Sequence, residues 1–338
     1  MLGNIVAPTS LHLLSSARDR GIAVERSRKG HEAMAKEIHI RVPASTANLG
    51  PGFDCLGMAL GLYHRLTVVE GEGKGLEIRA HGEGAADVAL DERNIVYQAL
   101  VEVLGETGYV PGRLLLESHN DIPLACGLGS SAAALLAGLA AGLLLSGKCL
   151  EWRHLIELGT GNEGHPDNIV PCALGGFTVA VVKGGEVIWN RLEPPEQLKG
   201  IVAIPDFRLP TREAREALPK RVDFADAVAN LGRVGLLVAG MAGGALELLR
   251  AGMEDRLHQP YRAELIPGME EVCGAALEAG ALGAALSGAG PAMLALVDGD
   301  RKEVGEAMKE AWKGRGIAAR TLTLDVDREG LQGEIIGR

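Results

Sequence analysis

Residues 122–145 read IPLACGLGSSAAALLAGLAAGLLL, a glycine-rich turn that opens directly into a long apolar helix. Glycines let the backbone turn tightly, and the first turn of a helix adds unpaired N–H groups and the positive end of the helix dipole. Together these features are typical of a site for phosphate groups. The plainer interpretation is a turn with an N-cap serine. A turn needs only one glycine and one cap, whereas this stretch has two of each: Gly127, Gly129, Ser130 and Ser131.

The stretch does not match the common nucleotide-binding motifs. No Lys-Ser or Lys-Thr pair follows Gly127 at the Walker A spacing, and GLGSSA lacks the third glycine of the dinucleotide-binding motif. A second glycine cluster, LSGAGPAM at residues 286–293, fails the dinucleotide pattern too, because Met293 takes the place of the third glycine. By itself this second cluster predicts a tight loop between two strands.

The composition is that of a folded, anionic chain. Of 338 residues, 47% are hydrophobic and 23% are charged, which excludes a disordered or collagen-like chain. Glycine, at 47 residues, is about twice as common as the usual ~7%, and it follows no fixed period. The net charge of −10 argues against a nucleic-acid-binding surface. The length predicts about two domains.

The cysteines and the apolar runs bear on the compartment. The five cysteines are scattered and show no metal-ligand spacing, so we expect reduced thiols in the cytoplasm and no structural zinc. The longest apolar run, Ala132 to Ser146, is too short for a membrane span and predicts a buried core helix. We therefore expect no membrane association.

Residues 1–35 differ from the rest of the chain. Their basic residues and serines resemble a transit peptide, but Asp19, Glu25 and Glu32 weaken that interpretation. We expect a non-core N-terminal extension, such as translation from an upstream start codon would produce.

The periodicity predicts short strands and longer helices in a mixed order. Since helices do not follow every strand, the pattern favours an α+β fold in two layers over a doubly wound sheet. A glycine- and proline-rich turn is expected at 44–57, and a domain boundary in EPPEQLKG, 193–200. The expected strands are Lys36–Val42, Leu60–Glu70, Leu76–Ala80, Leu114–Ser118, Gly175–Val182, Val187–Leu192, Ile201–Ile204, Ala284–Ser287, Met293–Asp298 and Ala318–Asp325. The expected helices, besides the one that begins near Ser130, are Asn94–Leu104, Trp152–Leu158, Thr211–Leu218, Ala225–Leu249, Ile266–Ala279 and Arg301–Arg315.

Two further clusters are ambiguous from the residues alone. In ELGTGNEGHPDN, 157–168, a helical carboxylate precedes His, Asp and Asn in a loop, which suits a metal ligand with polar substrate contacts or simply a solvated helix end. In ASTANLGPGFD, 44–54, Asn48 and Asp54 are also ordinary turn formers. Surface arginines are usually solvated, whereas an arginine aimed into a cleft is the usual partner of a substrate carboxylate.

Three motifs in this order carry a resemblance: VPASTANLGPGFD at 42–54, IPLACGLGSSAA at 122–133 and LSGAGPA at 286–292. Together they resemble the GHMP kinase superfamily, and the first motif, with HPDN at 165–168, resembles its homoserine kinase branch. The resemblance covers roughly residues 36–325. It implies a two-domain α+β fold, with a ribosomal S5 domain 2-like, ATP-binding domain at 36–195 and a ferredoxin-like domain at 196–330.

The resemblance also implies an activity. The activity is the ATP- and Mg²⁺-dependent phosphorylation of the L-homoserine hydroxyl to O-phospho-L-homoserine, a step of threonine biosynthesis. The resemblance also implies a homodimer. The alternatives are another small-molecule kinase of this superfamily and a non-catalytic ligand sensor on the same fold.

The resemblance assigns the nucleotide site residue by residue. It implies an adenine contact at Asn94 and Mg²⁺ ligands at Ser131 and Glu157, with Glu163 as second choice. The implied triphosphate loop comprises Pro123, Leu124, Ala125, Cys126, Gly127, Leu128, Gly129, Ser130, Ser131 and Ala132.

For the acceptor, the resemblance implies that Arg215 and Arg262 clamp the carboxylate, with Thr211 nearby. The implied contacts of the amino and hydroxyl ends are Asn48, Asp54, His165 and Asn168. The implied catalytic set is Asn168, Asn48 and Glu157. Mevalonate-type relatives have an aspartate base where this chain has Asn168, so we expect catalysis by positioning, without a dedicated base.

Overall fold

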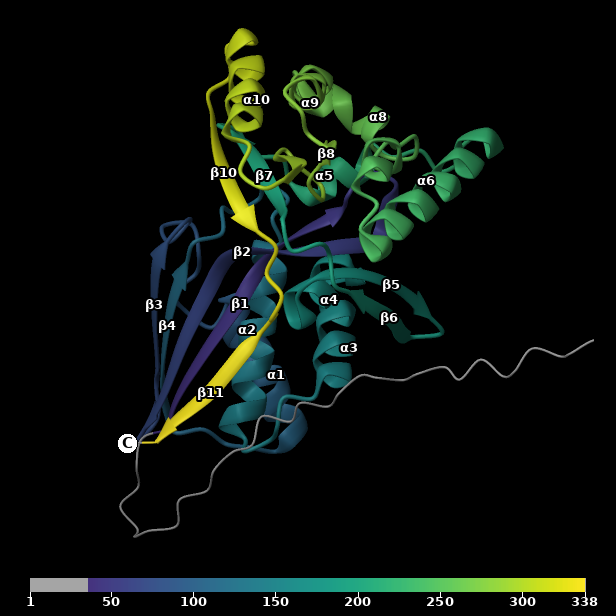
Figure 1. The fold of residues 1–338 in the computed structure, drawn as a ribbon. Coiled ribbons are helices and arrows are strands. Elements are labelled where there is room, and N and C mark those ends of the chain that lie inside the picture. Colours follow the sequence, from purple (N-terminus) through teal and green to yellow (C-terminus); the bar gives the residue numbers. More distant parts are fainter. Residues whose placement is uncertain (1–35, 338) are drawn as a thin grey trace, which may run out of the picture.

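The structure, a computed structural model, describes residues 36–337, so the expected extension at 1–35 lies outside the described part of the chain. Its first half is built on a seven-stranded sheet with the order β11-β1-β2-β4-β3, and β5 pairs with β2 and β6 (Figure 1). Among the strand pairs of this sheet in residues 36–337, only β3–β4 is parallel. The strands are β1 (Lys36–Asn48), β2 (Gly52–Gly71), β3 (Leu76–Gly82), β4 (Arg113–Asn120), β5 (Phe177–Lys183), β6 (Glu186–Leu192) and β11 (Gln332–Gly337).

Four helices cover one face of this sheet (Figure 1). The central helix is α2, and every residue of it except Ser131 is buried. A Cβ at Gly138 would lie 2.3 Å from the Val96 carbonyl oxygen, so small residues let α2 approach α1 closely. Part of the excess of glycine is therefore explained by packing. The helices are α1 (Ile95–Thr107), α2 (Ser130–Leu145), α3 (Trp152–Glu163) and α4 (Pro166–Leu174).

The second half is an antiparallel sheet with the order β10-β7-β9-β8. Side chains alternate between its two faces. Ile201 and Val297 pack with Trp312 in a core of their own, whereas Val202 and Leu294 join the core of the first half. The strands are β7 (Leu198–Pro205), β8 (Gly283–Leu286), β9 (Met293–Asp298) and β10 (Ala319–Asp325), and the main helices are α5 (Thr211–Glu216), α6 (Phe224–Gly243), α9 (Met269–Glu278) and α10 (Lys302–Gly314). The short helices are α7 (Leu249–Gly252) and α8 (Gln259–Arg262), with 3₁₀ turns η1 (Leu246–Leu248) and η2 (Ala263–Leu265).

The chain passes between the two halves twice. β6 ends at Leu192 and β7 begins at Leu198, on either side of the proline-rich segment in which we place the boundary. After β10 the chain returns to the first sheet, where β11 pairs with β1 (Figure 1). The crossing is held at Asp327, whose N–H donates to the Ala59 carbonyl and whose carbonyl accepts from Gly176. The periodicity of the sequence did not predict β11.

The expected α+β fold is confirmed, with three local corrections. The turn expected at 44–57 is mostly strand, because β1 runs to Asn48 and β2 begins at Gly52. The loop expected at 165–168 is the start of α4, where Pro166 takes the first helical position that suits proline. The helix expected at Ala225–Leu249 ends at Gly243, because Gly244 adopts a left-handed φ of +71° as its C-cap.

Two apolar helices differ in their surroundings. α2, which contains the run expected to be a core helix, is buried in the first core. α6 is long and apolar enough to cross a membrane by length and composition, and 22% of that window is buried. It lies at the outside of the second half (Figure 1) and exposes Phe224, Val228 and Leu231.

Candidate active site

A cavity lies where segments of both halves meet. The first half supplies the Asn48–Asp54 loop, the turn before α2 and the start of α4. The second half supplies Arg262 and the glycine turn between β8 and β9. The lining residues are Ala47, Asn48, Phe53, Asp54, Pro123, Ala125, Cys126, Gly127, Leu128, Gly129, Ser130, Ser131, Glu163, His165, Asp167, Asn168, Thr211, Arg215, Arg262, Gly288 and Ala289.

The turn before α2 requires its two glycines. Gly127 has a φ of +87°, and a Cβ there would lie 2.0 Å from the Ser287 carbonyl oxygen. Gly129 has a φ of +68°, and a Cβ there would lie 2.1 Å from Ser45 Oγ. Ser287 Oγ donates to the Gly127 carbonyl at 2.7 Å, which joins the second glycine cluster to the first. The cluster at 286–293 is thus part of the site and not an isolated loop.

The first turn of α2 is open toward the cavity. Its N-cap is Gly129 and no side chain caps it, so the interpretation of a simple turn with an N-cap serine is wrong. The N–H groups of this turn have no acceptor within the helix, and they stand at the positive end of its dipole. Since Ser130 and Ser131 also line the cavity, this end of it is suited to an anion.

Two positions of the expected triphosphate loop face elsewhere. Leu124 packs toward Gly84 and lines a neighbouring hollow, and Ala132 is fully buried in the first core. The other eight positions from Pro123 to Ser131 line the cavity.

Of the two candidate metal-binding glutamates, Glu163 lies beside Ser131. Ser131 Oγ donates to Glu163 Oε2 at 3.3 Å, and both residues line the cavity. Glu157 does not line it, and its Oε1 lies 3.5 Å from a guanidinium nitrogen of Arg153. Six residues of helix place Glu157 about 9 Å further along the axis of α3. The geometry therefore favours Glu163, and the choice of metal ligand stays a prediction.

Asn94 is the N-cap of α1. Its Oδ1 accepts from the N–H groups of Val96 and Tyr97, and its Nδ2 donates to the Ala89 carbonyl at 2.7 Å. The side chain is only 7% exposed and does not line the cavity. Its polar atoms are thus occupied locally, and an adenine contact at this residue stays a prediction.

The other end of the cavity is charged. Arg215 donates two hydrogen bonds to Asp54, at 2.7 and 3.1 Å, and this pairing raises the pKa of Arg215 despite partial burial. Arg262 is 1% exposed, and burial together with the nearby Arg215 lowers its pKa to about 10. Both guanidinium groups lie against the ring of Phe53, at 5.5 and 5.3 Å from its centroid. Sequence reasoning missed Phe53, whose contact with two arginines no local pattern indicates.

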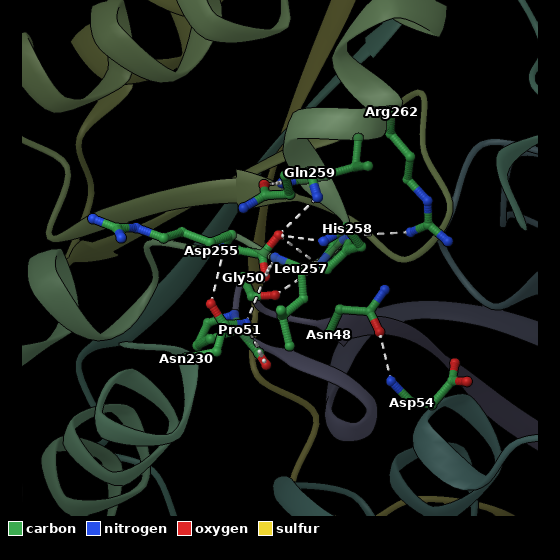
Figure 2. A network of polar contacts seen from close by, with 12 residues as sticks. Asn48, Gly50, Pro51, Asp54, Asn230, Asp255, Leu257, His258, Gln259 and Arg262 are labelled. Atoms are coloured by element: carbon green, nitrogen blue, oxygen red, sulfur yellow. Dashed lines mark hydrogen bonds and ion pairs between the residues drawn. The ribbon is translucent and has the colours of Figure 1, made fainter. Parts of the chain in front are cut away.

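Asn48 holds the loop that carries Asp54. It has a φ of +70°, and its Oδ1 accepts from the Asp54 N–H at 3.0 Å (Figure 2). Its Nδ2 donates to the Gly288 carbonyl at 2.9 Å. Both polar ends of the side chain are therefore used within the protein, and they connect the two halves at the cavity.

The start of α4 contributes three polar side chains. Asn168 Oδ1 accepts from Ser45 Oγ at 2.9 Å, and His165 Nδ1 lies 2.5 Å from Asp167 Oδ1. Burial alone lowers the pKa of His165, but the hydrogen bond to Asp167 and its charge outweigh burial, so the pKa is raised. Asp167, which is 2% exposed, was not chosen as a site residue from the sequence. Thr211 lies at the exposed rim, as expected near Arg215.

Comparison with known proteins identifies related chains. Residues 94–176 match the model of the GHMP kinases N terminal domain, and residues 234–314 match that of the GHMP kinases C terminal domain. A homoserine kinase of Moorella thermoacetica is 48% identical over 278 residues, which cover 82% of this chain and 93% of that protein. A homoserine kinase of Microchaete diplosiphon is 43% identical over 301 residues, covering 88% of this chain and 97% of that protein.

Solved structures agree with these relatives. The crystal structure of a homoserine kinase from Cytophaga hutchinsonii superimposes with a TM-score of 0.81 at 31% identity, covering 91% of this chain and 100% of that chain. A mevalonate kinase structure, at 16% identity and a TM-score of 0.66, covers 86% of this chain and 99% of that chain and shares the fold alone. The fold implied by the three motifs is confirmed, and the chain belongs to the homoserine kinase family of the GHMP kinases.

Proposed function

We propose that the protein transfers the γ-phosphoryl group of ATP to the hydroxyl of L-homoserine, giving O-phospho-L-homoserine and ADP in threonine biosynthesis. One observation carries the proposal: a single cavity joins an uncapped helix N-terminus to a set of opposite charges. The first end suits a triphosphate, and the second suits a substrate that carries both a carboxylate and an ammonium group.

The ion pair at the charged end supports an amino-acid acceptor. Without substrate, Asp54 and Arg215 neutralise each other at 2.7 Å. An α-amino acid would give Asp54 its ammonium group and give Arg215 and Arg262 its carboxylate, so every charge keeps a partner. An acceptor with a carboxylate but no ammonium, such as mevalonate, would leave Asp54 unpaired, which is unfavourable in a partly buried site.

At the phosphate end, Ser131 and Glu163 are the residues that would hold Mg²⁺ with the nucleotide. Their oxygens lie 3.3 Å apart, and hydroxyl and carboxylate oxygens are the ligands that Mg²⁺ prefers. When bound, the ion would neutralise charge on the phosphates. The backbone of the Gly127–Ser131 turn would hold the triphosphate and orient it toward Asn168.

Catalysis in this proposal rests on positioning. An amide cannot accept the hydroxyl proton, and phosphoryl transfer asks mainly for alignment and charge stabilisation. Asn168→Asp tests this view, because it restores the carboxylate of mevalonate-type relatives. We expect no gain in activity. Higher activity together with a new acidic limb in the pH profile would show that a general base accelerates the reaction, and it would contradict catalysis by positioning alone.

An ADP-release assay with homoserine, mevalonate, shikimate and galactose tests the activity itself. We expect turnover with homoserine only. Turnover with another acceptor would favour a different kinase of the superfamily, and tight binding of homoserine without turnover would favour a ligand sensor. We also propose a cytoplasmic homodimer that needs neither a membrane nor nucleic acid; light scattering of the purified protein checks the dimer.

A further inference from the structure

A buried polar network lies next to Asn48 and Arg262, two residues that line the cavity (Figure 2). Its centre is Asp255, whose side chain is 0% exposed. The carboxylate accepts hydrogen bonds from the backbone N–H groups of Leu257, His258 and Gln259 at 2.7–2.9 Å and from Asn230 Nδ2 at 2.7 Å. The loop that leads into α8 is therefore fixed to α6.

His258 connects this loop to both halves of the molecule. Its Nε2 lies 2.7 Å from the Gly50 carbonyl oxygen, and its Nδ1 lies 3.2 Å from a terminal nitrogen of Arg262. A carbonyl only accepts and a guanidinium only donates, so Nε2 carries the proton and Nδ1 accepts. One neutral tautomer satisfies both contacts. Burial, aided by the charge of Arg262, lowers the pKa of His258 although Asp255 opposes this, which agrees with the neutral form.

The Gly50 end of this contact is equally constrained. Gly50 has a φ of +89°, and a Cβ there would lie 2.1 Å from the Met253 carbonyl oxygen. The Asn48–Asp54 loop is thus pressed against the segment that contains Asp255, and Asn230 Nδ2 also lies 3.4 Å from the Pro51 carbonyl. His258 therefore links the loop that carries Asp54 to the helix that carries Arg262 by hydrogen bonds to both.

Arg262 has one end free for a ligand. Its Nε donates to the Ala214 carbonyl at 3.1 Å, and one terminal nitrogen donates to Gly288 at 3.0 Å and to His258. Within residues 36–337 no hydrogen bond uses the other terminal nitrogen, and Arg262 lines the cavity. Of the three acceptors that hold the guanidinium plane, His258 Nδ1 is the one supplied by a side chain, so it is the one that a substitution can remove.

We propose that His258 is a positioning residue for the acceptor site: it orients the Arg262 guanidinium and keeps it in register with the Asp54 loop. The proposal rests on the proposed function, in which Arg262 receives the substrate carboxylate. It assigns to His258 a role in the recognition of an α-amino acid and none in the binding of the nucleotide.

Two amide substitutions separate the two contacts of the imidazole. The amide of His258→Asn lies near the position of Nδ1, so its oxygen can still accept from Arg262. The amide of His258→Gln reaches the position of Nε2, so it can still donate to Gly50 but loses Arg262. We expect His258→Gln to raise the homoserine KM about 10- to 50-fold and His258→Asn by less than 5-fold, with the ATP KM within twofold in both. His119→Gln, an exposed histidine on β4, is the matched control and should change neither constant.

The outcomes distinguish the possible failures. A merely structural role would lower the melting temperature of both variants and change both KM values together, which would overturn the proposal. Equal effects of Asn and Gln on the homoserine KM would overturn it as well. If the wild-type protein neither binds nor phosphorylates homoserine, the proposed function fails and the inference fails with it. Wild-type turnover with an unchanged homoserine KM in His258→Gln would overturn the inference alone.

Discussion

The two ends of the cavity are built in opposite ways. The phosphate end is made of contiguous backbone, the Gly127–Ser131 turn and the first turn of α2, and only Glu163 adds a charge. The other end is made of the charged side chains Asp54, Arg215 and Arg262, brought together from distant parts of the chain. Activity should thus fall when a Cβ is added at a glycine of the phosphate end, and when a charge is left unpaired at the charged end.

Gly127→Ala is expected to have the largest effect, because its Cβ would meet the Ser287 carbonyl at 2.0 Å in a left-handed backbone. A displacement of about 1 Å in a reacting group costs roughly 100-fold in rate, so we expect kcat/KM for ATP to fall at least that far. Steady-state kinetics measures this. Gly161→Ala on α3 is the control, since nothing lies within 4 Å of its Cβ. Wild-type kcat/KM for ATP in Gly127→Ala would show that use of the nucleotide does not depend on the conformation of this turn.

Arg215→Leu tests the charged end. It removes the partner of Asp54 and one donor to the substrate carboxylate, and charge-assisted bonds contribute about 1.5–3 kcal/mol. We expect the homoserine KM to rise about 10- to 100-fold while the ATP KM stays within twofold. Arg212→Leu, on the same helix and 89% exposed, should leave both constants unchanged. Equal changes in the two KM values would contradict the separation of the two ends.

Glu163→Gln tests the only carboxylate that we assign to the phosphate end. We expect the Mg²⁺ concentration for half-maximal activity to rise about 10-fold, because the variant loses a charged ligand next to Ser131. Glu157→Gln, two turns earlier on α3, serves as the control and should behave as wild type. The reverse ranking would return the metal site to Glu157.

The smallest effect concerns pH and involves His165, which lies close enough to Asp54 and Arg215 at the charged end for their charges to act on it. The pKa of His165 is raised in the folded protein by Asp167, against its ordinary value of 6.5. Its stabilising contribution is therefore complete below about pH 6.5 and is lost as the pH rises through the raised pKa. Urea unfolding of wild type and His165→Gln should show a stability difference that is larger at pH 6 than at pH 9. A difference that grows with pH would show that the His165–Asp167 pair does not hold its proton.

The difference between the two ends of the cavity also explains which features could be predicted from the sequence. Contiguous features could be predicted: the turn before α2, the burial of α2, the β5–β6 hairpin and the α+β order all follow from local pattern. The charged end could be assigned only through the family resemblance, because its residues meet through tertiary structure. Phe53 and His258 were missed for that reason, and β11 was missed because its pairing with β1 joins opposite ends of the described chain.

One error has a simpler cause. Pro166 was interpreted as part of a loop, although proline at the first position begins a helix. The choice between Glu157 and Glu163 as the metal ligand stays a prediction. α3 ends at Glu163, and this last residue lines the cavity whereas Glu157 does not.

The return of the chain through β11 has a mechanical consequence. Two connections, which we call tethers, join the halves at 193–197 and 326–331. The second half therefore cannot rotate freely relative to the first, as it could on a single flexible linker. The second tether is fixed at Asp327, which accepts from Tyr63 at 3.0 Å and from the Gly330 N–H at 2.7 Å. Any relative motion of the halves must accommodate both tethers. We expect a force applied at Gly337 to separate β11 from β1 before it reaches β10 in the second half.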